Sequence, residues 1–448
     1  MGRLFGTDGA RGVANSELTP ELAMNIGRAA ASVLTKDNDR PKFLIGKDTR
    51  QSSDMLEAAL AAGLCSVGAD VLILGVVPTP AVAYLVKKYK YDAGVMISAS
   101  HNPCEFNGIK IFQGTGYKLP DEIENRIEAI ILDGVEQPPV KIGGEVGKIS
   151  YSNTAVDDYI AHILSCKQAD FSGLKVAFDC ANGSSSATAY QLFSALGIDG
   201  VYTANEPNGV NINDKCGSTH LEALKKCVLD NGCSLGFAFD GDADRMLAVD
   251  ENGNEVDGDK IIAICAKYMK EQGTLKNDTA VVTVMSNMGF FKFCEENGIS
   301  CQKTAVGDRY VLENMLKNHF NIGGEQSGHV IFLDHSTTGD GQLSALMLLN
   351  VIQNSKKTLS ELAAEMEVYP QVLVNVKVTP QGKDAYATDA VIADKIAQVE
   401  AKLNGEGRVL VRLSGTEPLL RVMLEGKDLD EITAAANDIA ALVKERLA

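Results

Sequence analysis

Short apolar segments that suit β-strands alternate with longer helical patterns through most of the chain. Three of these segments, at 43–45, 176–178 and 280–284, each run into a polar loop, a helical stretch and a further β-prone run. A glycine closes each helical stretch, as is typical of the left-handed residue at a helix end (Gly68, Gly197 and Gly298). The alternation predicts parallel α/β sheets, whose strand-end loops are the natural positions for ligands.

The C-terminal part of the chain follows a different pattern. Val372–Val378 and Arg408–Leu413 alternate apolar and polar residues, and Leu420–Leu424 is also β-prone, which predicts a small, partly antiparallel sheet. An apolar stripe at helical spacing predicts a terminal helix after it. We therefore expect three similar mixed α/β domains and a smaller C-terminal α+β domain, with the ranges 1–155, 156–255, 256–370 and 371–448.

Composition narrows the range of partners. The 448 residues carry a formal net charge of −17, which argues against nucleic acid or an anionic membrane, because both favour a basic surface. The 10 cysteines include no C-x-x-C pair and no zinc-ligand spacing, so we expect reduced, mostly buried thiols. The sequence shows no apolar leader and no stretch long enough to span a bilayer, and we expect a soluble, cytoplasmic protein.

The strongest chemical signal is an acidic triplet, Asp240, Asp242 and Asp244, which follows a β-prone segment and precedes Arg245. Carboxylates at alternate positions repel each other unless a cation lies between them, and oxygen ligands select Mg²⁺ or Ca²⁺. An EF-hand is excluded because Arg245 stands where its sharp turn needs glycine. A phosphatase of the haloacid-dehalogenase type, with Asp240 as nucleophile, is an alternative, but Asp244 fits a third metal ligand better. A solvated acidic turn is the remaining interpretation.

A second loop follows the apolar run 95–97 and contains Ser98, Ser100 and His101, with Lys110 further along. A serine carries a phosphoryl group when hydrogen-bond donors surround it and a base manages its proton. We expect Ser100 to be the reactive hydroxyl and Ser98 to cap the loop. An ordinary loop serine beside a histidine is the alternative.

Two further loops suit a sugar phosphate. The first places Glu325, Ser327 and His329 among glycines, so that it can approach sugar hydroxyls closely, although an incidental tight turn would look the same. The second combines guanidiniums and hydroxyls around a glycine, as an anion site does (Arg412, Ser414, Gly415, Thr416 and Arg421). A polar hairpin turn with solvent-facing arginines is its alternative.

Taken in order, the motifs FGTDGARG, ISASHNP, DGDADR, GEQSGH and RLSGTEP resemble those of the α-D-phosphohexomutase superfamily over essentially the whole chain. The FGTDG opening, Gln326 and the loop with Asp308 and Arg309 are most similar to the phosphoglucosamine mutases. This resemblance implies four domains around a central cleft. It also implies the interconversion of glucosamine 6-phosphate and glucosamine 1-phosphate through a phosphoserine and a hexosamine 1,6-bisphosphate, on the route to UDP-N-acetylglucosamine, in a homodimer.

The same resemblance implies roles for individual residues. Ser100 would be the phosphoserine and would bind one Mg²⁺ together with Asp240, Asp242 and Asp244. Catalytic roles are implied for four further residues (Arg11, His101, Lys110 and His329). Substrate binding is implied for two sets, one at the sugar and transferred phosphoryl group (Arg245, Asp308, Arg309, Glu325 and Ser327) and one at the other phosphate (Arg412, Ser414, Gly415, Thr416 and Arg421).

Three other functions stay open from the residues. A phosphomannomutase or phosphoglucomutase would use the same loops on another hexose. An Asp240-based phosphatase would release free phosphate. A sugar-phosphate sensor would bind without turnover, although the complete serine and metal set argues against it.

Overall fold

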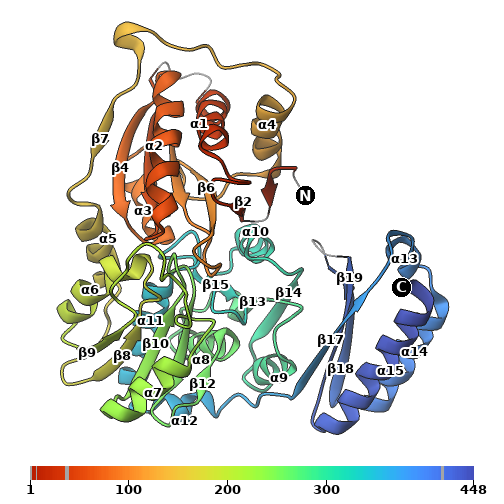
Figure 1. Cartoon of the computed structure of the whole chain (residues 1–448). Helices are drawn as coiled ribbons and strands as arrows, with labels where there is room; N and C mark the ends of the chain where they lie inside the picture. Colours follow the sequence, from red (N-terminus) through yellow and green to blue (C-terminus); the bar gives the residue numbers. More distant parts are fainter. Residues whose placement is uncertain (1–2, 7, 36–39, 415–417) are drawn as a thin grey trace. The chain divides into compact units, whose positions relative to one another are not determined.

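The computed structural model of the chain describes residues 3–6, 8–35, 40–414 and 418–448. They cluster into two compact units (Figure 1). The larger unit comprises Met1–Met285 and Gly298–Glu365, and the smaller comprises Ser286–Asn297 and Met366–Ala448.

The first sheet of the larger unit has the strand order β1-β2-β6-β5-β3-β4-β7. Its strands are β1 (Phe5–Gly6), β2 (Gly9–Val13), β6 (Phe106–Gln113), β5 (Ala93–Ile97), β3 (Lys42–Lys47), β4 (Asp70–Val76) and β7 (Ile149–Tyr151). Its helices are α1 (Pro20–Leu34), α2 (Gln51–Ser66), α3 (Thr79–Lys88) and α4 (Asp121–Leu132), and the 3₁₀ turn η1 (Gly143–Glu145) precedes β7. Alternate residues of β3 and β5, such as Phe43 and Val95, form one buried cluster with apolar residues of α1, α2 and α4.

The second sheet has the order β12-β11-β10-β8-β9. Its strands are β12 (Glu255–Val256), β11 (Met246–Asp250), β10 (Leu235–Phe239), β8 (Lys175–Asp179) and β9 (Asp199–Thr203). The helical elements of this region are α5 (Ala155–Leu164), η2 (Ser184–Ala187), α6 (Ala189–Ala195) and α7 (Glu222–Asn231). Leu224 and Val228 of α7 pack with Ala177 and Ala238 of the sheet.

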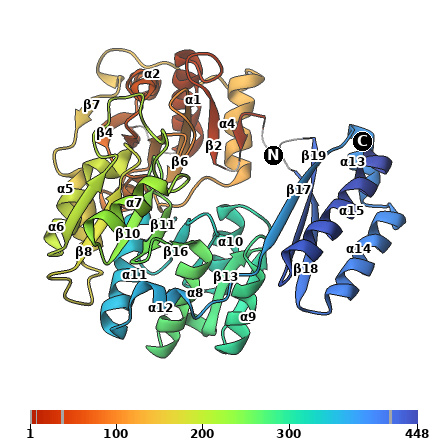
Figure 2. The ribbon, with the colours of Figure 1, turned by 60° about the horizontal axis from the view of Figure 1, so that its bottom comes forward.

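The third sheet has the order β14-β13-β15-β16. Its strands are β14 (Ser300–Thr304), β13 (Thr279–Thr283), β15 (Ile322–Gly324) and β16 (Val330–Phe332). The helical elements are α8 (Gly258–Glu271), η3 (Lys276–Asp278), α10 (Asp308–Asn318), α11 (Gly341–Ser355) and α12 (Leu359–Ala363). Helices α8 and α10 lie beside β13 (Figure 2).

These sheets share one arrangement. A central strand (β3, β8 or β13) has a parallel neighbour on each side, and one neighbour (β5, β10 or β15) pairs on its far side with an antiparallel strand (β6, β11 or β16). The antiparallel strand follows its partner directly in the chain. Three similar mixed α/β sheets are therefore present, as the sequence predicted.

The smaller unit contains an antiparallel sheet of order β17-β19-β18. Its strands are β17 (Gln371–Lys377), β19 (Leu419–Gly426) and β18 (Gly407–Leu413), and its helices are α9 (Met288–Glu296), α13 (Pro380–Tyr386), α14 (Ala390–Leu403) and α15 (Leu429–Leu447). Ile432, Ile439 and Val443 of α15 are buried with the apolar face of this sheet. The predicted α+β domain with its terminal helix is confirmed, although the sheet is antiparallel throughout the described residues.

Two smaller expectations can also be compared with the structure. Gly68, Gly197 and Gly298 have positive φ angles of 97°, 85° and 62°, as predicted for residues that end helices. In the described part of the chain, no helix combines the length and the apolarity needed to cross a bilayer.

Candidate active site

Three topologically equivalent connections contain the motifs that the sequence singled out. The connection from β5 to β6 contains residues 98–105, that from β10 to β11 contains residues 240–245, and that from β15 to β16 contains residues 325–329. Each joins a strand parallel to the central strand to its antiparallel neighbour. The expected serine, metal and sugar loops therefore occupy one position in three related sheets.

The acidic triplet lies in the loop between β10 and β11. Asp240, Asp242 and Asp244 are buried, and each offers a carboxylate oxygen within 4.8 Å of the others. Oδ1 of Asp242 is buried and has no hydrogen-bond partner in the described structure, whereas Oδ1 of Asp244 has only the longer contacts to His329 at 3.6 Å and Arg245 at 4.0 Å. Buried carboxylate oxygens without donors are costly unless a cation satisfies them, and Mg²⁺ prefers such oxygens. The donor set therefore fits a magnesium ion.

Ser100 meets this triplet directly. Its Oγ donates to Oδ2 of Asp240 at 2.6 Å, although the two residues are 140 positions apart in the sequence. The φ angle of Ser100 is 51°, and such left-handed backbone costs a non-glycine residue about 1–3 kcal/mol. Gly241 makes the contact possible, because a Cβ atom there would lie 2.5 Å from the carbonyl oxygen of Ser100.

A buried arginine holds the serine loop in this conformation. The guanidinium of Arg50 donates to the carbonyls of Ser100 at 3.0 Å and Asn102 at 2.8 Å, and also to the carbonyls of Pro103 and Phe106. Its Nε donates to Asp48 at 2.8 Å, and both side chains are fully buried. A rigid planar fork with several donors is well suited to fixing a loop of carbonyl groups. Sequence analysis missed Arg50, although it lies in the polar loop after the first predicted strand.

Two further contacts fix the backbone of Ser100. The amide of Ser100 donates to Oγ of Ser98 at 3.0 Å, and that hydroxyl donates to Asp48 at 2.6 Å, so Ser98 caps the loop as expected. On the other side, Nδ2 of Asn213 donates to the carbonyls of Ser100 at 2.9 Å and Asn102 at 3.0 Å. Asn213 belongs to the connection between β9 and α7, so it ties the serine loop to the second sheet. No sequence motif pointed to it.

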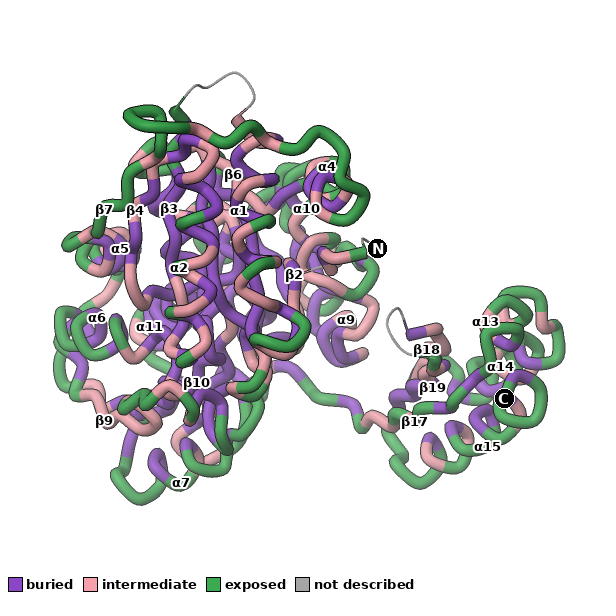
Figure 3. Tube along the Cα trace, turned by 45° about the horizontal axis from the view of Figure 1, so that its top comes forward, coloured by how far each residue is buried: buried purple, intermediate pink, exposed green. Residues whose placement is uncertain are grey.

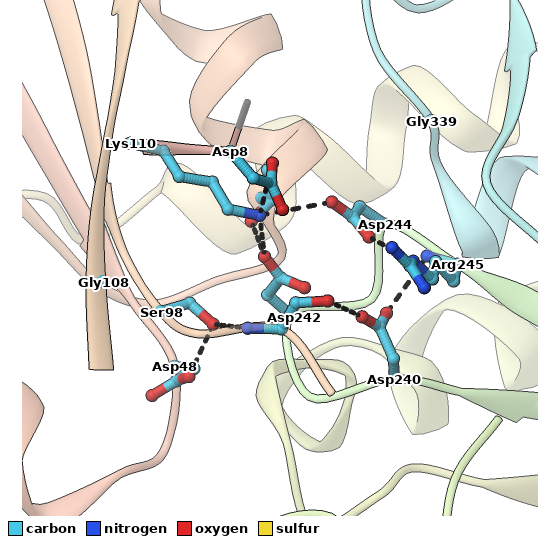
Figure 4. A network of polar contacts seen from close by, with 12 residues as sticks. Asp8, Asp48, Ser98, Gly108, Lys110, Asp240, Asp242, Asp244, Arg245 and Gly339 are labelled. Carbon is cyan, nitrogen blue, oxygen red and sulfur yellow. Dashed lines mark hydrogen bonds and ion pairs between the residues drawn. The ribbon is translucent and has the colours of Figure 1, made fainter. Parts of the chain in front are cut away.

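Lys110 reaches from β6 toward the metal loop (Figure 4). Its Nζ lies 2.8 Å from Oδ2 of Asp242 and 3.4 Å from Oδ2 of Asp244. Burial alone would lower the pKa of Lys110, but the carboxylates of Asp242, Asp8 and Asp244 raise it above its ordinary value. Lys110 is therefore a fixed positive charge beside Ser100 and the triplet.

Lys110 also begins a ring of alternating basic and acidic side chains. Its Nζ lies 3.6 Å from Asp8, and Asp8 lies 2.7 Å from Lys118. Lys118 in turn lies 2.6 Å from Asp308 at the start of α10. Asp8 and Lys118 were also missed by the sequence analysis. Asp8 lies within the FGTDG motif, whereas Lys118 had no recognisable signal because its partners are distant in the sequence.

His329 closes this ring. One of its ring nitrogens lies 3.5 Å from Asp308 and the other 3.6 Å from Asp244, which returns to Lys110 at 3.4 Å. The amide of Gly339 donates to Nε2 of His329 at 3.0 Å. The carboxylates of Asp244 and Asp308 raise the pKa of His329 against burial. Against burial, Lys110 and His329 hold the pKa of Asp244 well below its usual range.

His101, Arg11 and Arg245 surround the serine from other directions. Nδ1 of His101 lies 3.3 Å from Oγ of Ser100. Burial and the neighbouring charges of Arg245 and Arg11 lower the pKa of His101 to about 4, so its ring is neutral near pH 7. Arg11 pairs with Asp8, and Arg245 lies 4.0 Å from Asp244. These side chains therefore lie at the centre where the sequence placed them.

The remaining residues of the larger unit that we expect to bind substrate differ in their contacts. Asp308 belongs to the charge ring, whereas Arg309 pairs with Asp121 and with Glu313 of its own helix. Glu325 accepts a hydrogen bond from the amide of Gly307 at 3.1 Å, which links the sugar loop to the start of α10. Ser327 is exposed at the tip of its loop.

The expected phosphate site lies in the smaller unit. Arg412 and Arg421 face each other in the register of β18 and β19, and both are partly exposed. Burial and the neighbouring charge of Arg421 lower the pKa of Arg412. Ser414 is buried at the end of β18, whereas Gly415 and Thr416 lie outside the described residues.

Models of one known protein family match all of these regions of the chain. Four models of phosphoglucomutase/phosphomannomutase match in order: the α/β/α domains I, II and III at residues 2–137, 157–253 and 257–369, and the C-terminal domain at 373–442. A phosphoglucosamine mutase from Acetivibrio thermocellus is 57% identical over 448 residues, which is 100% of both chains. The chain belongs to the phosphoglucomutase/phosphomannomutase family.

Solved structures show the same fold for this family member. A phosphoglucomutase/phosphomannomutase family protein from Burkholderia thailandensis has a TM-score of 0.83 at 23% identity, covering 100% of this chain and 99% of the other. The N-acetylphosphoglucosamine mutase of Aspergillus fumigatus, solved with GlcNAc-6P and magnesium, has a TM-score of 0.69 at 17% identity, covering 100% and 96%.

The geometry favours Ser100 over Asp240 as the residue that accepts a phosphoryl group. Both oxygens of Asp240 are engaged, Oδ2 by the hydroxyl of Ser100 and Oδ1 by the amide of Arg245 at 3.1 Å. Burial and the carboxylates of Asp244 and Asp242 also raise the pKa of Asp240 well above its usual range. A carboxylate in this setting suits cation binding better than nucleophilic attack.

Proposed function

We propose that this family member is a phosphoglucosamine mutase, which moves a phosphoryl group between the 6- and 1-positions of glucosamine through a phosphoserine at Ser100. The observation that supports this most is the contact of 2.6 Å between Ser100 and a buried aspartate triplet. The phosphoserine would give its group to the free hydroxyl of the sugar phosphate, producing glucosamine 1,6-bisphosphate. That intermediate would then return its other phosphate to Ser100.

One Mg²⁺ would be held by Asp240, Asp242 and Asp244 with an oxygen of the Ser100 phosphoryl group, and it would supply positive charge for the transferring group. The buried Oδ1 of Asp242, which has no hydrogen-bond partner in the described residues, supports this proposal. The Aspergillus fumigatus mutase, which has the same fold, was solved with magnesium.

Positively charged side chains of the protein would also stabilise the transferring phosphoryl group. Phosphoryl transfer spreads negative charge over the equatorial oxygens, so fixed cations lower its barrier. Lys110 and Arg245 are held beside the triplet by its carboxylates and would stabilise that charge. Arg11 would add a third cation from β2.

In the first half of the cycle the attacking sugar hydroxyl loses a proton and the oxygen of Ser100 gains one. In the second half the hydroxyl of Ser100 loses its proton and the sugar oxygen that is freed gains one. His101, whose pKa is lowered to about 4, has the neutral ring that suits a proton acceptor, whereas Asp244, against burial, raises the pKa of His329, which suits a proton donor. We propose that they share these proton transfers. Glu325 and Ser327 would bind sugar hydroxyls, while Asp308 and Arg309 would line the sugar-binding side.

The phosphate that is not being transferred needs a second site, because the bisphosphate presents its two phosphates to Ser100 in turn. Arg412, Ser414 and Arg421 would form that site, together with Gly415 and Thr416 of the same motif. Two opposed guanidiniums and a nearby hydroxyl support this assignment. We further propose a cytoplasmic homodimer that is activated by hexosamine 1,6-bisphosphate.

The substrate preference is tested by turnover of glucosamine 6-phosphate, glucose 6-phosphate and mannose 6-phosphate under identical conditions with Mg²⁺ and the matching bisphosphate. We expect the highest kcat/KM for glucosamine 6-phosphate. A preference for glucose or mannose would instead identify a phosphoglucomutase or phosphomannomutase, the activities for which the family models are named. Release of inorganic phosphate in place of isomerisation would contradict both.

A further inference from the structure

A cavity of about 440 Å³ is lined by α3, α5 and the connection from β16 to α11. None of its lining residues belongs to the candidate active site. Helices α3 and α5 pack beside each other (Figure 1), and α5 lies at the periphery of the larger unit, with buried and exposed residues (Figure 3). The volume lies within the range of small-molecule sites, about 300–1,000 Å³.

Positive charge predominates in the lining of this cavity. Lys87 and Lys88 enter it from the last turn of α3. Lys88 pairs with Asp158 at 2.6 Å, whereas Lys87 is exposed and no carboxylate of the described chain pairs with it. Asp334, the acidic residue of the lining, already pairs with Lys276, which holds its pKa below the ordinary value against burial. One ammonium group of the cavity is therefore available to an anion.

Two histidines of the lining are fixed by their neighbours. His162 stacks on Tyr84 with ring centroids 4.0 Å apart, and its Nε2 donates to the carbonyl of His335 at 2.9 Å. Burial and the nearby charge of Lys88 lower the pKa of His162, so its ring is neutral and its Nδ1 can accept a hydrogen bond. Nδ1 of His335 lies 3.5 Å from Sγ of Cys166, which leaves Nε2 of that ring for a ligand.

Helix α3 joins the cavity to the metal loop. At the other end of this helix of 10 residues, Oγ1 of Thr79 donates to Oδ2 of Asp242 at 2.6 Å. The amide of Thr79 also donates to the carbonyl of Asp242 at 2.9 Å. An α-helix of this length spans about 15 Å and is a rigid element, so a shift of its lysine end reaches the triplet.

The connection from β16 to α11 provides a second route to the same centre. Thr337 lines the cavity, and two residues later the amide of Gly339 donates to Nε2 of His329 at 3.0 Å. The amide of Gly341 then donates to the carbonyl of Ala243 in the metal loop, also at 3.0 Å. Figure 4 shows Gly339 on the side of the triplet where Asp244 and Arg245 lie (Figure 4). A ligand that moves this wall of the cavity therefore also moves catalytic groups.

We propose that this cavity is an effector site for a phosphorylated small molecule, whose phosphate binds Lys87, Lys88 and His335. The ammonium group of lysine is a compact charge that commonly binds phosphate. A hydroxyl group of the same molecule donates to Nδ1 of His162. Occupancy changes turnover through α3 and through the connection from β16 to α11. The effector role rests on the proposed mutase activity, whereas binding to the cavity does not.

Labelling of the full chain with pyridoxal 5′-phosphate tests binding without an assay of turnover. The aldehyde of this probe forms an imine with a lysine amine, with loss of water, while its phosphate occupies the site. After borohydride reduction, peptide mass spectrometry should show Lys87 or Lys88 labelled at least about 10-fold faster than Lys90, an exposed lysine beyond the end of α3. Inorganic phosphate should slow this labelling, and acetate should not. Equal rates at these lysines, no protection by phosphate, or equal protection by acetate would overturn the proposal.

Steady-state kinetics test the effector role. At saturating glucosamine 6-phosphate, inorganic phosphate should change kcat of the wild type by about fivefold or more, the lower end of typical coupling between two sites. Lys87→Glu should keep the basal kcat and lose this response, whereas the matched control Lys90→Glu should keep both. A response that persists in Lys87→Glu, or no response in a wild type whose Lys87 phosphate protects, would refute the coupling. Protection in a protein without mutase activity would instead contradict the proposed function and support the binding site.

Discussion

Two regions of the molecule gather charge in opposite ways. Around Ser100, acidic and basic side chains alternate in a closed ring, and each charge lies beside one of opposite sign. In the smaller unit, Arg412 and Arg421 stand directly opposite each other on neighbouring strands, where like charges repel. The first region pairs charges of opposite sign within the protein, whereas the second places two charges of like sign side by side, as the proposed phosphate site needs.

This difference suggests two kinds of catalytic contribution. A balanced, buried network is preorganised, so it holds its charges in place without rearrangement during the reaction. A pair of like charges gains most when a phosphate arrives between them. Changes in the first region should therefore affect chemistry more than binding, and changes in the second should do the reverse.

Ser100→Ala should give the largest effect. Loss of the nucleophile should lower kcat for isomerisation by at least about 10⁴-fold, the scale seen when a covalent nucleophile is removed. The free energy of unfolding should change by only about 1 kcal/mol, because one hydrogen bond to Asp240 is lost. Coupled-assay kinetics and denaturant unfolding measure the two quantities. Near-normal turnover would disprove the role of Ser100.

Removing the metal site should come next. Asp242→Asn should weaken Mg²⁺ binding and lower kcat by about 10²–10³-fold, because it takes a charge from the triplet. Chelation of the wild type should abolish turnover, and added Mg²⁺ should restore it. Isothermal titration with Mg²⁺ measures the binding directly.

Asp250→Asn is the matched control for this change, since Asp250 is a buried aspartate of the same hairpin outside the triplet. It should lose stability but keep its affinity for Mg²⁺. An Asp242→Asn protein that binds Mg²⁺ as tightly as the wild type would show that the triplet is not the metal site.

Arg421→Gln should act mainly on binding. Loss of a charge-assisted contact to phosphate, about 1.5–3 kcal/mol, should raise KM roughly 10–100-fold while phosphorylation of Ser100 is retained. Stability should stay the same or rise slightly, since the repulsion with Arg412 is relieved. Lys402→Gln, at a 70% exposed side chain of the same unit, should leave KM unchanged. A fall in kcat with constant KM would reverse the comparison between the two regions.

Asn213→Ala should have the smallest effect. It removes two hydrogen bonds to the carbonyls of Ser100 and Asn102, so the free energy of unfolding should fall by about 1–2 kcal/mol. Because the serine loop is then held less firmly, kcat should fall roughly 10-fold with little change in KM. Asn211→Ala in the same connection is the control, because its side chain does not reach the serine loop. Equal kcat for both variants would remove Asn213 from the positioning set.

The secondary-structure elements and the motifs could be predicted from the sequence, whereas the tertiary contacts between the motifs could not. Strand and helix periodicity is local, so the three α/β sheets and the C-terminal sheet could be predicted from it. Ser100 and Asp240 could be recognised as candidates because the residues that their chemistry needs lie close to them in the sequence. That they touch across 140 positions is a product of folding, and only the fold shows it.

The missed residues have a common physical reason. Arg50 is an ordinary loop arginine in the sequence, and its role comes from four carbonyls that the serine loop brings around it. Lys118 gains its importance only when α10 places Asp308 within 2.6 Å. Such residues act through tertiary contacts, which leave no local pattern.

The central claim is that Ser100 exchanges a phosphoryl group with a hexosamine bisphosphate at the aspartate triplet. Peptide mass spectrometry of the wild-type protein, after incubation with glucosamine 1,6-bisphosphate and Mg²⁺, tests it most directly. We predict one phosphoryl group on Ser100, which disappears when excess glucosamine 6-phosphate is added. A phosphoryl group on Asp240, or an unmodified Ser100 under conditions where isomerisation proceeds, would contradict the account.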